Sequence, residues 1–244
     1  MRPVNHRACQ DEPVPQPSVS VDEAVARAVE LARTADRAQT ADPARTSDPD
    51  RTATRAVLGI TGAPGAGKST LARRIVSEVD AALGPGTAVQ VPMDGFHLAN
   101  AALDELGRHD RKGAIDTFDA GGYVALVRRL AANTEPVVWA PDFDRRIDEP
   151  VAGSIAVPRS ARLVVTEGNY LLDADEPWAD LVDLFTETWA CVVDDAVRVD
   201  RLVGRHMRHG RDHDAARAWA LEVDGVNAAR VAARVGRASR TVRT

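Results

Sequence analysis

The strongest constraint on the fold is a glycine-rich run at residues 62–69, GAPGAGKS, which follows a short apolar segment. It matches the pattern G-x-x-x-x-G-K-[ST] at every fixed position. Glycines allow successive backbone N–H groups to turn inward, and a following helix adds its positive N-terminal end. An ordinary glycine-rich turn is the alternative, but the apolar run before the loop and the amphipathic pattern after it disfavour that interpretation. We therefore expect a loop that cradles phosphate groups.

The pattern assigns a role to each residue type in this loop. Lys68 can reach the β- and γ-phosphates of a nucleotide, and the Ser69 hydroxyl can ligate Mg²⁺. The residues expected to contact the nucleotide are Gly62, Ala63, Pro64, Gly65, Ala66, Gly67, Lys68, Ser69 and Thr70.

Strand-like and helix-like patterns alternate from residue 55 onward. Short apolar runs at 56–61, 87–94, 161–168 and 189–195 predict strands, and amphipathic segments at 68–79, 123–133, 196–209 and 214–233 predict helices. This order is typical of an α/β protein with a parallel sheet flanked by helices on both faces. Together with the loop, it predicts a P-loop NTPase fold, whose ligands sit beyond the carboxyl ends of the strands.

The first 54 residues have a different composition. The Pro-rich residues 1–17 predict a disordered tail, and 41–54, rich in Asp, Pro and Thr, predict a linker. Between them, 18–40 predict a helix, with a capping box formed by Ser20 and Glu23 and an apolar face along Val21, Val25, Val29 and Ala32. The predicted organisation is thus a tail, an N-terminal helix, a linker and one α/β domain over 55–244.

Composition excludes several classes of function. The net charge of −5 disfavours a nucleic-acid partner, and the sequence has no apolar run long enough to suggest a membrane partner. Cys9 and Cys191 are too far apart in sequence to suggest a metal motif, so we expect a cytoplasmic protein. A guanine-reading N-K-x-D motif and a transporter signature are both missing from the sequence.

Two acidic residues follow predicted strands on the same edge of the sheet. Asp94 ends the segment VPMD, where a carboxylate can orient an attacking hydroxyl and accept its proton. Glu167 follows the buried run LVVT at 163–166, where it can hold Mg²⁺ with Ser69. The alternative for either acid is that it only caps the next segment.

The ordered set of motifs resembles the phosphoribulokinase/uridine kinase/pantothenate kinase superfamily. The set is GAPGAGKS, then MDGFH at 93–97, RKG at 111–113, DFDRR at 142–146 and VVTEGN at 164–169, followed by an Arg-rich helix. The resemblance covers about residues 55–235 and is greatest to the branch of small bacterial nucleoside/nucleotide kinase-like, or fructose-kinase-like, proteins. It implies ATP and Mg²⁺ as cofactors, with Asp94 as the catalytic aspartate.

The resemblance also implies which residues face the acceptor. These are Phe96, His97, Arg111, Lys112, Phe143, Arg145 and Asn169. It further implies that Asn227 contacts the nucleotide. From the residues alone, the charged members of this set are polar groups in predicted loops, and a solvated surface remains the alternative.

An arginine-rich helix follows the last predicted strand. Arg201, Arg205 and Arg208 have i, i+4, i+7 spacing and share one face, while Leu202 and Met207 are expected to pack elsewhere. These cations predict a helical lid that closes over the nucleotide, with Arg205 and Arg208 as catalytic groups beside Lys68 and Asp94. The alternative is a solvated face paired with nearby aspartates. The histidines at 206, 209 and 213 are expected on the surface rather than at a metal.

The sequence therefore predicts a kinase that phosphorylates a hydroxyl of a small metabolite. A sugar or nucleoside is the expected acceptor, and a pantothenate-like acceptor is less favoured. A nucleoside monophosphate kinase and a nucleotide-dependent regulatory protein without an acceptor remain as alternatives. The expected partner is the small-molecule acceptor itself, and a homodimer is left open.

Overall fold

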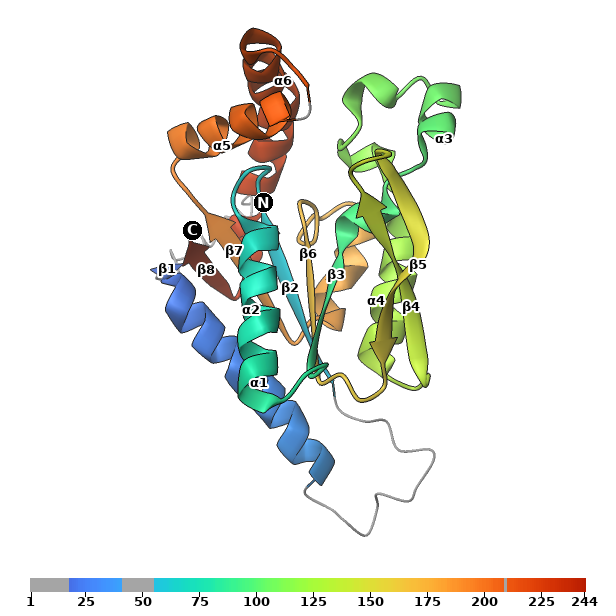
Figure 1. Ribbon diagram of the computed structural model, residues 1–244, viewed down its shortest axis with the longest axis vertical. Coiled ribbons are helices and arrows are strands. Elements are labelled where there is room, and N and C mark those ends of the chain that lie inside the picture. The colour runs from blue at the N-terminus through green and yellow to red at the C-terminus, as the bar shows by residue number, and fades with distance from the viewer. Residues whose placement is uncertain (1–17, 41–54, 209) are drawn as a thin grey trace, which may run out of the picture.

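The computed structural model describes residues 18–40, 55–208 and 210–244 of the 244-residue chain. The predicted tail at 1–17, the predicted linker at 41–54 and His209 lie outside the described residues. Figure 1 shows a central sheet with helices on both sides and two arms that rise beyond one end of its strands. Within the described residues, no helix combines the length and apolar character that crossing a bilayer requires.

The main sheet is parallel and has six strands in the order β1-β8-β7-β2-β6-β3. The strands are β1 (Ser18–Val19), β2 (Ala56–Gly62), β3 (Ala88–Pro92), β6 (Leu163–Gly168), β7 (Glu187–Val192) and β8 (Arg240–Arg243). The predicted α/β fold and its parallel sheet are therefore confirmed. The prediction missed β1 and β8, because strands this short leave no clear alternation in the sequence.

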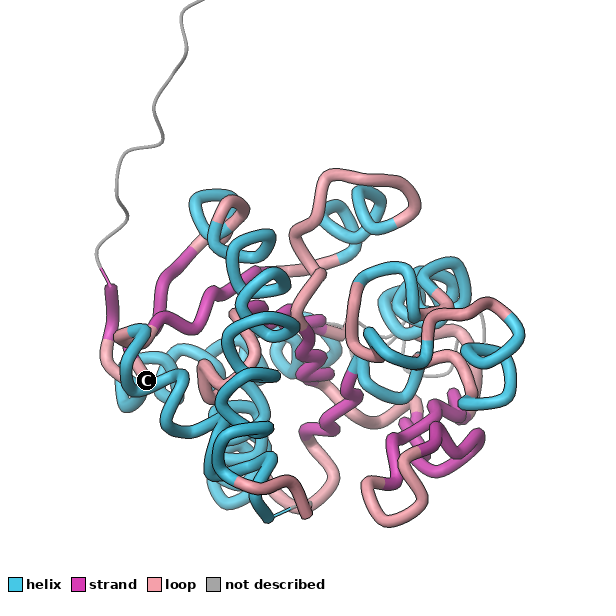
Figure 2. Tube along the Cα trace, turned by 90° about the horizontal axis from the view of Figure 1, so that it is seen from above, coloured by secondary structure: helices cyan, strands magenta, loops and turns pink. Residues whose placement is uncertain are grey.

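Alternating residues of the central strand divide the core in two. On β2, Val57 joins the cluster on one face, whereas Leu58 and Ile60 join the cluster on the other. The first face is covered by α4 (Ala120–Ala132) and the 3₁₀ helix η5 (Trp178–Leu184), and the second by α1 (Val21–Thr40) and α2 (Lys68–Leu83). Helices thus lie on both faces, as the sequence predicted (Figure 2).

The N-terminal helix shares its core with the glycine-rich loop. Ser20 and Glu23 form the predicted capping box, with the Ser20 backbone N–H donating to Glu23 over 2.8 Å. The predicted apolar face was only partly right, because Ala32 is fully buried as expected but Val21, Val25 and Val29 are partly buried. The fully buried face consists of small residues and one leucine, Ala24, Ala28, Leu31 and Ala32. Small side chains let α1 approach the sheet and α2 closely.

A separate two-stranded sheet stands beside the main one. Strands β4 (Val137–Asp144) and β5 (Glu149–Pro158) form an antiparallel hairpin with an irregularity between Ala140 and Asp142. Sequence analysis placed DFDRR in a loop, but Phe143 and Asp144 end β4 and Arg145 begins the turn. The hairpin was missed because β5 contains Gly153 and prolines and is exposed along much of its length, so it lacks the apolar pattern of a buried strand.

Two helical arms flank the carboxyl ends of the sheet strands (Figure 1). One consists of α5 (Asp195–Arg208) and α6 (His213–Ala232), which begin and end within one residue of the predicted helices. The other contains α3 (Asn100–Glu105) and the 3₁₀ helices η3 (His109–Arg111) and η4 (Ile115–Thr117). The predicted second strand also ends early, at Pro92, because the chain turns into the 3₁₀ helix η2 (Met93–Phe96).

Candidate active site

The glycine-rich loop joins the end of β2 to the start of α2 and has the shape of an anion cradle. Gly65 has φ +82°, and a Cβ atom there would lie 2.9 Å from the Arg198 carbonyl oxygen of α5. Only glycine combines that conformation with this close approach. No side chain caps the start of α2, and its first turn holds no acid. The loop and helix end therefore suit phosphate oxygens, whose charge the exposed N–H groups and the helix dipole would stabilise.

Lys68 is held across this loop by polar groups on both sides. Its Nζ donates to the Ala63 carbonyl over 3.1 Å and to Oδ1 of Asn169 over 2.8 Å. The side chain is buried, with 8% of the residue exposed. Burial lowers the pKa of Lys68, and the negative charges of Glu167 and Asp94 oppose that effect. The ammonium thus lies close to both acids that sequence analysis singled out.

Asp94 lies in η2, immediately beyond the end of β3. Its side chain is 32% exposed, and its Oδ2 accepts a hydrogen bond from Nη2 of Arg145 over 2.9 Å. Burial acts to raise the pKa of Asp94, but the positive charges of His97, Arg145 and Lys68 together lower it below its ordinary value. The carboxyl group is therefore ionised at neutral pH, with one of its two oxygens bonded to Arg145.

Glu167 lies at the same edge of the sheet. It pairs in register with Ile60 of β2 and Pro92 of β3, which places it between the glycine-rich loop and Asp94. Burial and the charge of Asp94 raise its pKa, whereas Lys68 and a hydrogen bond with Ser69 act in the other direction. A buried carboxylate in contact with the Ser69 hydroxyl is a fitting partial ligand set for Mg²⁺.

This ligand set fits the way proteins bind Mg²⁺ together with phosphates. The ion usually takes one or two protein ligands and completes its shell with water and substrate oxygens. The described residues contain no cluster of three or more His, Cys, Asp or Glu side chains that could hold a metal alone. Ser69 and Glu167 could therefore hold the ion only together with a bound nucleotide.

Comparison with known proteins identifies the family. A protein of Schizosaccharomyces pombe, assigned provisionally as a uridine kinase, is 36% identical over 163 residues, which are 64% of this chain and 68% of that protein. The uncharacterised protein YggC of Escherichia coli is 34% identical over 185 residues, 72% of this chain and 73% of YggC. The chain belongs to the uridine kinase-like family of P-loop kinases. No protein-family model matches the chain.

Solved structures agree with this membership. A Silicibacter sp. TM1040 protein, assigned provisionally as a fructose transport system kinase, superposes with a TM-score of 0.71 at 36% identity, over 86% of this chain and 98% of its own. YFH7 of Saccharomyces cerevisiae, described provisionally as a P-loop kinase with a circular permutation, superposes with a TM-score of 0.76 at 17% identity, over 93% and 99%. The second match supports the fold alone. The P-loop NTPase fold expected from the sequence is thus confirmed.

In this P-loop kinase, aromatic rings stand beside Asp94. The His97 ring lies 4.1 Å from that of Phe118 and 4.8 Å from that of Phe143, measured between centroids. Nδ1 of His97 lies 2.8 Å from the Asp94 carbonyl oxygen. The Phe96 ring packs on Tyr123 at 5.3 Å, against the core. Of the two rings predicted to face the acceptor, that of His97, which follows η2, contacts Phe143 of the hairpin at a tilt of 51°, whereas that of Phe96 contacts the core.

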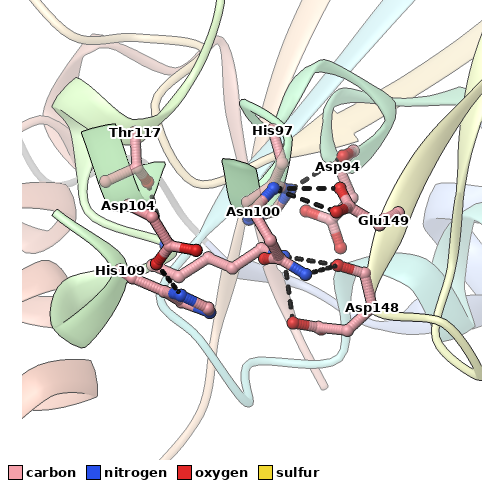
Figure 3. Close-up of polar contacts among 10 residues, drawn as sticks. Asp94, His97, Asn100, Asp104, His109, Thr117, Asp148 and Glu149 are labelled. Carbon is pink, nitrogen blue, oxygen red and sulfur yellow. Dashed lines mark hydrogen bonds and ion pairs between the residues drawn. The ribbon is translucent and has the colours of Figure 1, made fainter. Parts of the chain in front are cut away.

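The predicted acceptor-side cations have partners within the chain. Arg111 forms two hydrogen bonds with Asp116, of 2.7 and 2.6 Å, and both side chains are exposed. Lys112 is largely buried and donates to Asn100 Oδ1 and Asp148 Oδ2 over 2.6 and 2.9 Å. Figure 3 shows Asn100 bonded both to Asp148, the last residue of the hairpin turn, and to Glu149, the first residue of β5. Lys112 thus joins α3 to that turn.

The arginines of the arm formed by α5 and α6 differ in burial and in the residues that they approach. Arg205 is partly buried, and burial lowers its pKa against the opposing charges of Asp224 and Asp94. Arg208 is exposed. Nη1 of Arg201 would lie 3.6 Å from a Cβ atom on Gly67, so Arg201 reaches the glycine-rich loop. Leu202 is buried as expected, but Met207 is 45% exposed rather than packed.

Contacts between distant residues complete the arm, and sequence analysis missed them. His206 was expected on the surface, but its side chain is 14% exposed and its Nε2 lies 2.8 Å from Oδ2 of Asp224 on α6. Asn227 donates to the Gly113 carbonyl over 3.4 Å, so it contacts the segment after Lys112. Its predicted nucleotide contact stays a prediction. No local pattern marks these residues, because their partners are set by the tertiary fold.

Proposed function

We propose that this chain is an ATP- and Mg²⁺-dependent kinase that transfers the γ-phosphoryl group to a hydroxyl of a small metabolite, a sugar or a nucleoside. The observation that carries the proposal is the convergence of Lys68, Asp94 and Glu167 at one end of the sheet, where Glu167 pairs in register with Ile60 and Pro92 and the charges of both acids act on the pKa of Lys68. Ligands of open α/β sheets bind at this edge.

Each residue of the site would have a separate role in phosphoryl transfer. The glycine-rich loop and Lys68 would hold the donor phosphates, and Mg²⁺ held with Ser69 and Glu167 would neutralise charge on them. Asp94 would orient the acceptor hydroxyl. As the hydroxyl oxygen bonds to the γ-phosphorus, the bond from that phosphorus to the β–γ bridging oxygen breaks, ADP leaves, and the hydroxyl proton passes to Asp94.

Charge pairing favours an acceptor without a phosphate group. Arg111 and Lys112 pair with Asp116 and Asp148, and Arg146 pairs with Asp144 at 2.6 Å. Among the cations that sequence analysis assigned to the acceptor, Arg145 is the one whose described ion pair reaches Asp94. A nucleoside monophosphate would need several free cations to bind its phosphate. A neutral hydroxyl compound needs none.

The test measures ADP release by the purified protein with ATP and Mg²⁺ across sugars, nucleosides, pantothenate and nucleoside monophosphates. We expect acceptor-dependent turnover with a sugar or nucleoside. Asp94→Asn should retain nucleotide affinity and lose about 10²–10⁴-fold in turnover, the usual contribution of a general base. Turnover restricted to monophosphates would favour the nucleotide kinase alternative. Near-wild-type turnover in Asp94→Asn would reject the assigned mechanism.

A further inference from the structure

The ion pair between Arg145 and Asp94 has no evident value for stability. Arg145 stands in the turn between β4 and β5, and its side chain is 52% exposed, while that of Asp94 is 32% exposed. Exposed pairs of this kind contribute ~0–1 kcal/mol. Yet Nη2 of Arg145, at 2.9 Å, occupies an oxygen of the carboxylate that the proposed function needs as a proton acceptor. The pair therefore calls for a functional explanation.

We propose that Arg145 is a gate that blocks Asp94 until an acceptor binds and so prevents the enzyme from transferring phosphoryl groups to water. This inference rests on the proposed function of Asp94. Hydrolysis would need a water oxygen to bond to the γ-phosphorus, the bond to the β–γ bridging oxygen to break, and the water proton to pass to Asp94. A guanidinium already bonded to that carboxylate leaves the water poorly oriented. An acceptor that binds beside Asp94 displaces the guanidinium and takes its place.

The hairpin turn that carries Arg145 is attached to the arm that contains α3, η3 and η4. Glu149, at the end of the turn, accepts hydrogen bonds from the Asn100 backbone N–H over 3.0 and 3.1 Å. Lys112 bonds both Asn100 and Asp148, as described above (Figure 3). Strand β4 lies directly on η2, since a Cβ atom on Gly95 would be 2.5 Å from the Pro141 carbonyl oxygen. A ligand that shifts the arm would therefore also shift the turn and Arg145.

Arg145 also has room to move. Its guanidinium carbon lies 5.8 Å from the centre of the Phe143 ring, so the ring can hold the charge when the carboxylate is given up. About half of the side chain is already in solvent, so its displacement opens no cavity. The gate can thus open by rotation of one side chain, without unfolding of the hairpin.

The test measures phosphate release from ATP in the absence of any acceptor, so it does not depend on knowing the acceptor. We expect Arg145→Met to raise this hydrolysis at least about tenfold, because proton transfer to a general base is commonly worth about 10²–10⁴-fold. Arg145→Lys keeps a cation beside Asp94 and should stay near the wild-type rate. The matched control is Arg128→Met, which removes an exposed arginine paired with Asp180 at 3.3 Å on the outer surface of α4.

Two further measurements make the outcome decisive. The combination of Arg145→Met with Asp94→Asn should return hydrolysis to the wild-type rate, and the affinity for a fluorescent ADP analogue should be the same in all variants. Unchanged or lower hydrolysis in Arg145→Met would overturn the gate, as would a rise that persists without Asp94. Failure of the proposed function looks different, because it appears as a lack of acceptor-dependent ADP release while acceptor-free hydrolysis still responds to Arg145.

Discussion

Nζ of Lys68 donates a hydrogen bond of 2.8 Å to Oδ1 of Asn169, the residue that follows β6. The Asn169 carbonyl in turn accepts a bond of 3.0 Å from the Thr61 hydroxyl of β2. Asn169 is therefore fixed to the strand that leads into the glycine-rich loop. Sequence analysis assigned it to the acceptor, but in the structure its side chain holds the loop lysine in place.

This contact predicts a nucleotide-binding defect in Asn169→Ala. A hydrogen bond to a charged group contributes about 1.5–3 kcal/mol, and 1.4 kcal/mol corresponds to a tenfold change in affinity. We expect the dissociation constant for an ATP analogue to rise at least about tenfold by calorimetry. Thr61→Val, which removes the bond to the backbone alone, should have a smaller effect. Equal affinities in wild type and Asn169→Ala would mean that the Ala63 carbonyl alone positions Lys68.

The sequence could predict those parts of the site whose conformation follows from the pattern of neighbouring residues. The Gly62–Ser69 spacing and the apolar strands before Asp94 and Glu167 are continuous stretches whose geometry follows from backbone rules. The parts that it missed are pairs of distant residues, such as Lys68 with Asn169 or His206 with Asp224. Each depends on which strands become neighbours and how the arms fold back, and a single sequence carries no direct signal of either. The β4–β5 hairpin was missed for a different reason, since an exposed strand has no buried face to impose a pattern.

Removing the charge of Glu167 is predicted to have opposite effects on stability and on activity. Burial and Asp94 raise the pKa of Glu167 in the folded protein, so the folded state binds more protons than the unfolded state between the two pKa values. Stability due to this group therefore falls as pH rises, and the penalty is complete above the folded pKa. Glu167→Gln removes the charge and can retain the hydrogen bond with Ser69.

We expect nucleotide-free Glu167→Gln to be more thermostable than wild type at pH values above the raised pKa of folded Glu167. A gain of ~1 kcal/mol corresponds to a Tm increase of about 2–4 °C in a protein of this size. The increase should shrink as the pH falls through the raised pKa of folded Glu167, because the wild-type carboxyl group then becomes protonated as well. The same variant should lose most of its Mg²⁺-dependent phosphoryl transfer. Thermal unfolding at several pH values checks the first effect, and a Tm below that of wild type at every pH would contradict it.

The arm formed by α5 and α6 predicts different contributions to turnover from Arg205 and Arg208, which sequence analysis treated together. Arg205 is partly buried and close enough to Asp94 and Asp224 for their charges to affect its pKa, whereas Arg208 is exposed. We expect Arg205→Ala to reduce turnover about 10³-fold, the lower end of the range for an arginine that stabilises phosphoryl transfer. Arg208→Ala should change it less than about tenfold, because a solvated charge contributes little. Steady-state kinetics with the acceptor identified by the panel measure both effects. Equal losses of turnover in the two variants would mean that Arg205 and Arg208 contribute equally to catalysis, as the sequence predicted.

The last prediction concerns the N-terminal helix, which packs on the core of the kinase although the residues that join it to β2 lie outside the described part of the chain. Ala28 of α1 is fully buried beside the sheet, whereas Ala26 on the same helix is exposed. Ala28→Leu adds volume to a packed interface and should cost about 1–3 kcal/mol of unfolding free energy. Ala26→Leu adds the same atoms to the solvent side and should be nearly neutral. If α1 is integral to the core, thermal unfolding of Ala28→Leu should remain a single transition at lower Tm. Identical melting of the two variants would instead mean that α1 contributes nothing to the stability of the sheet that holds Lys68 and Glu167.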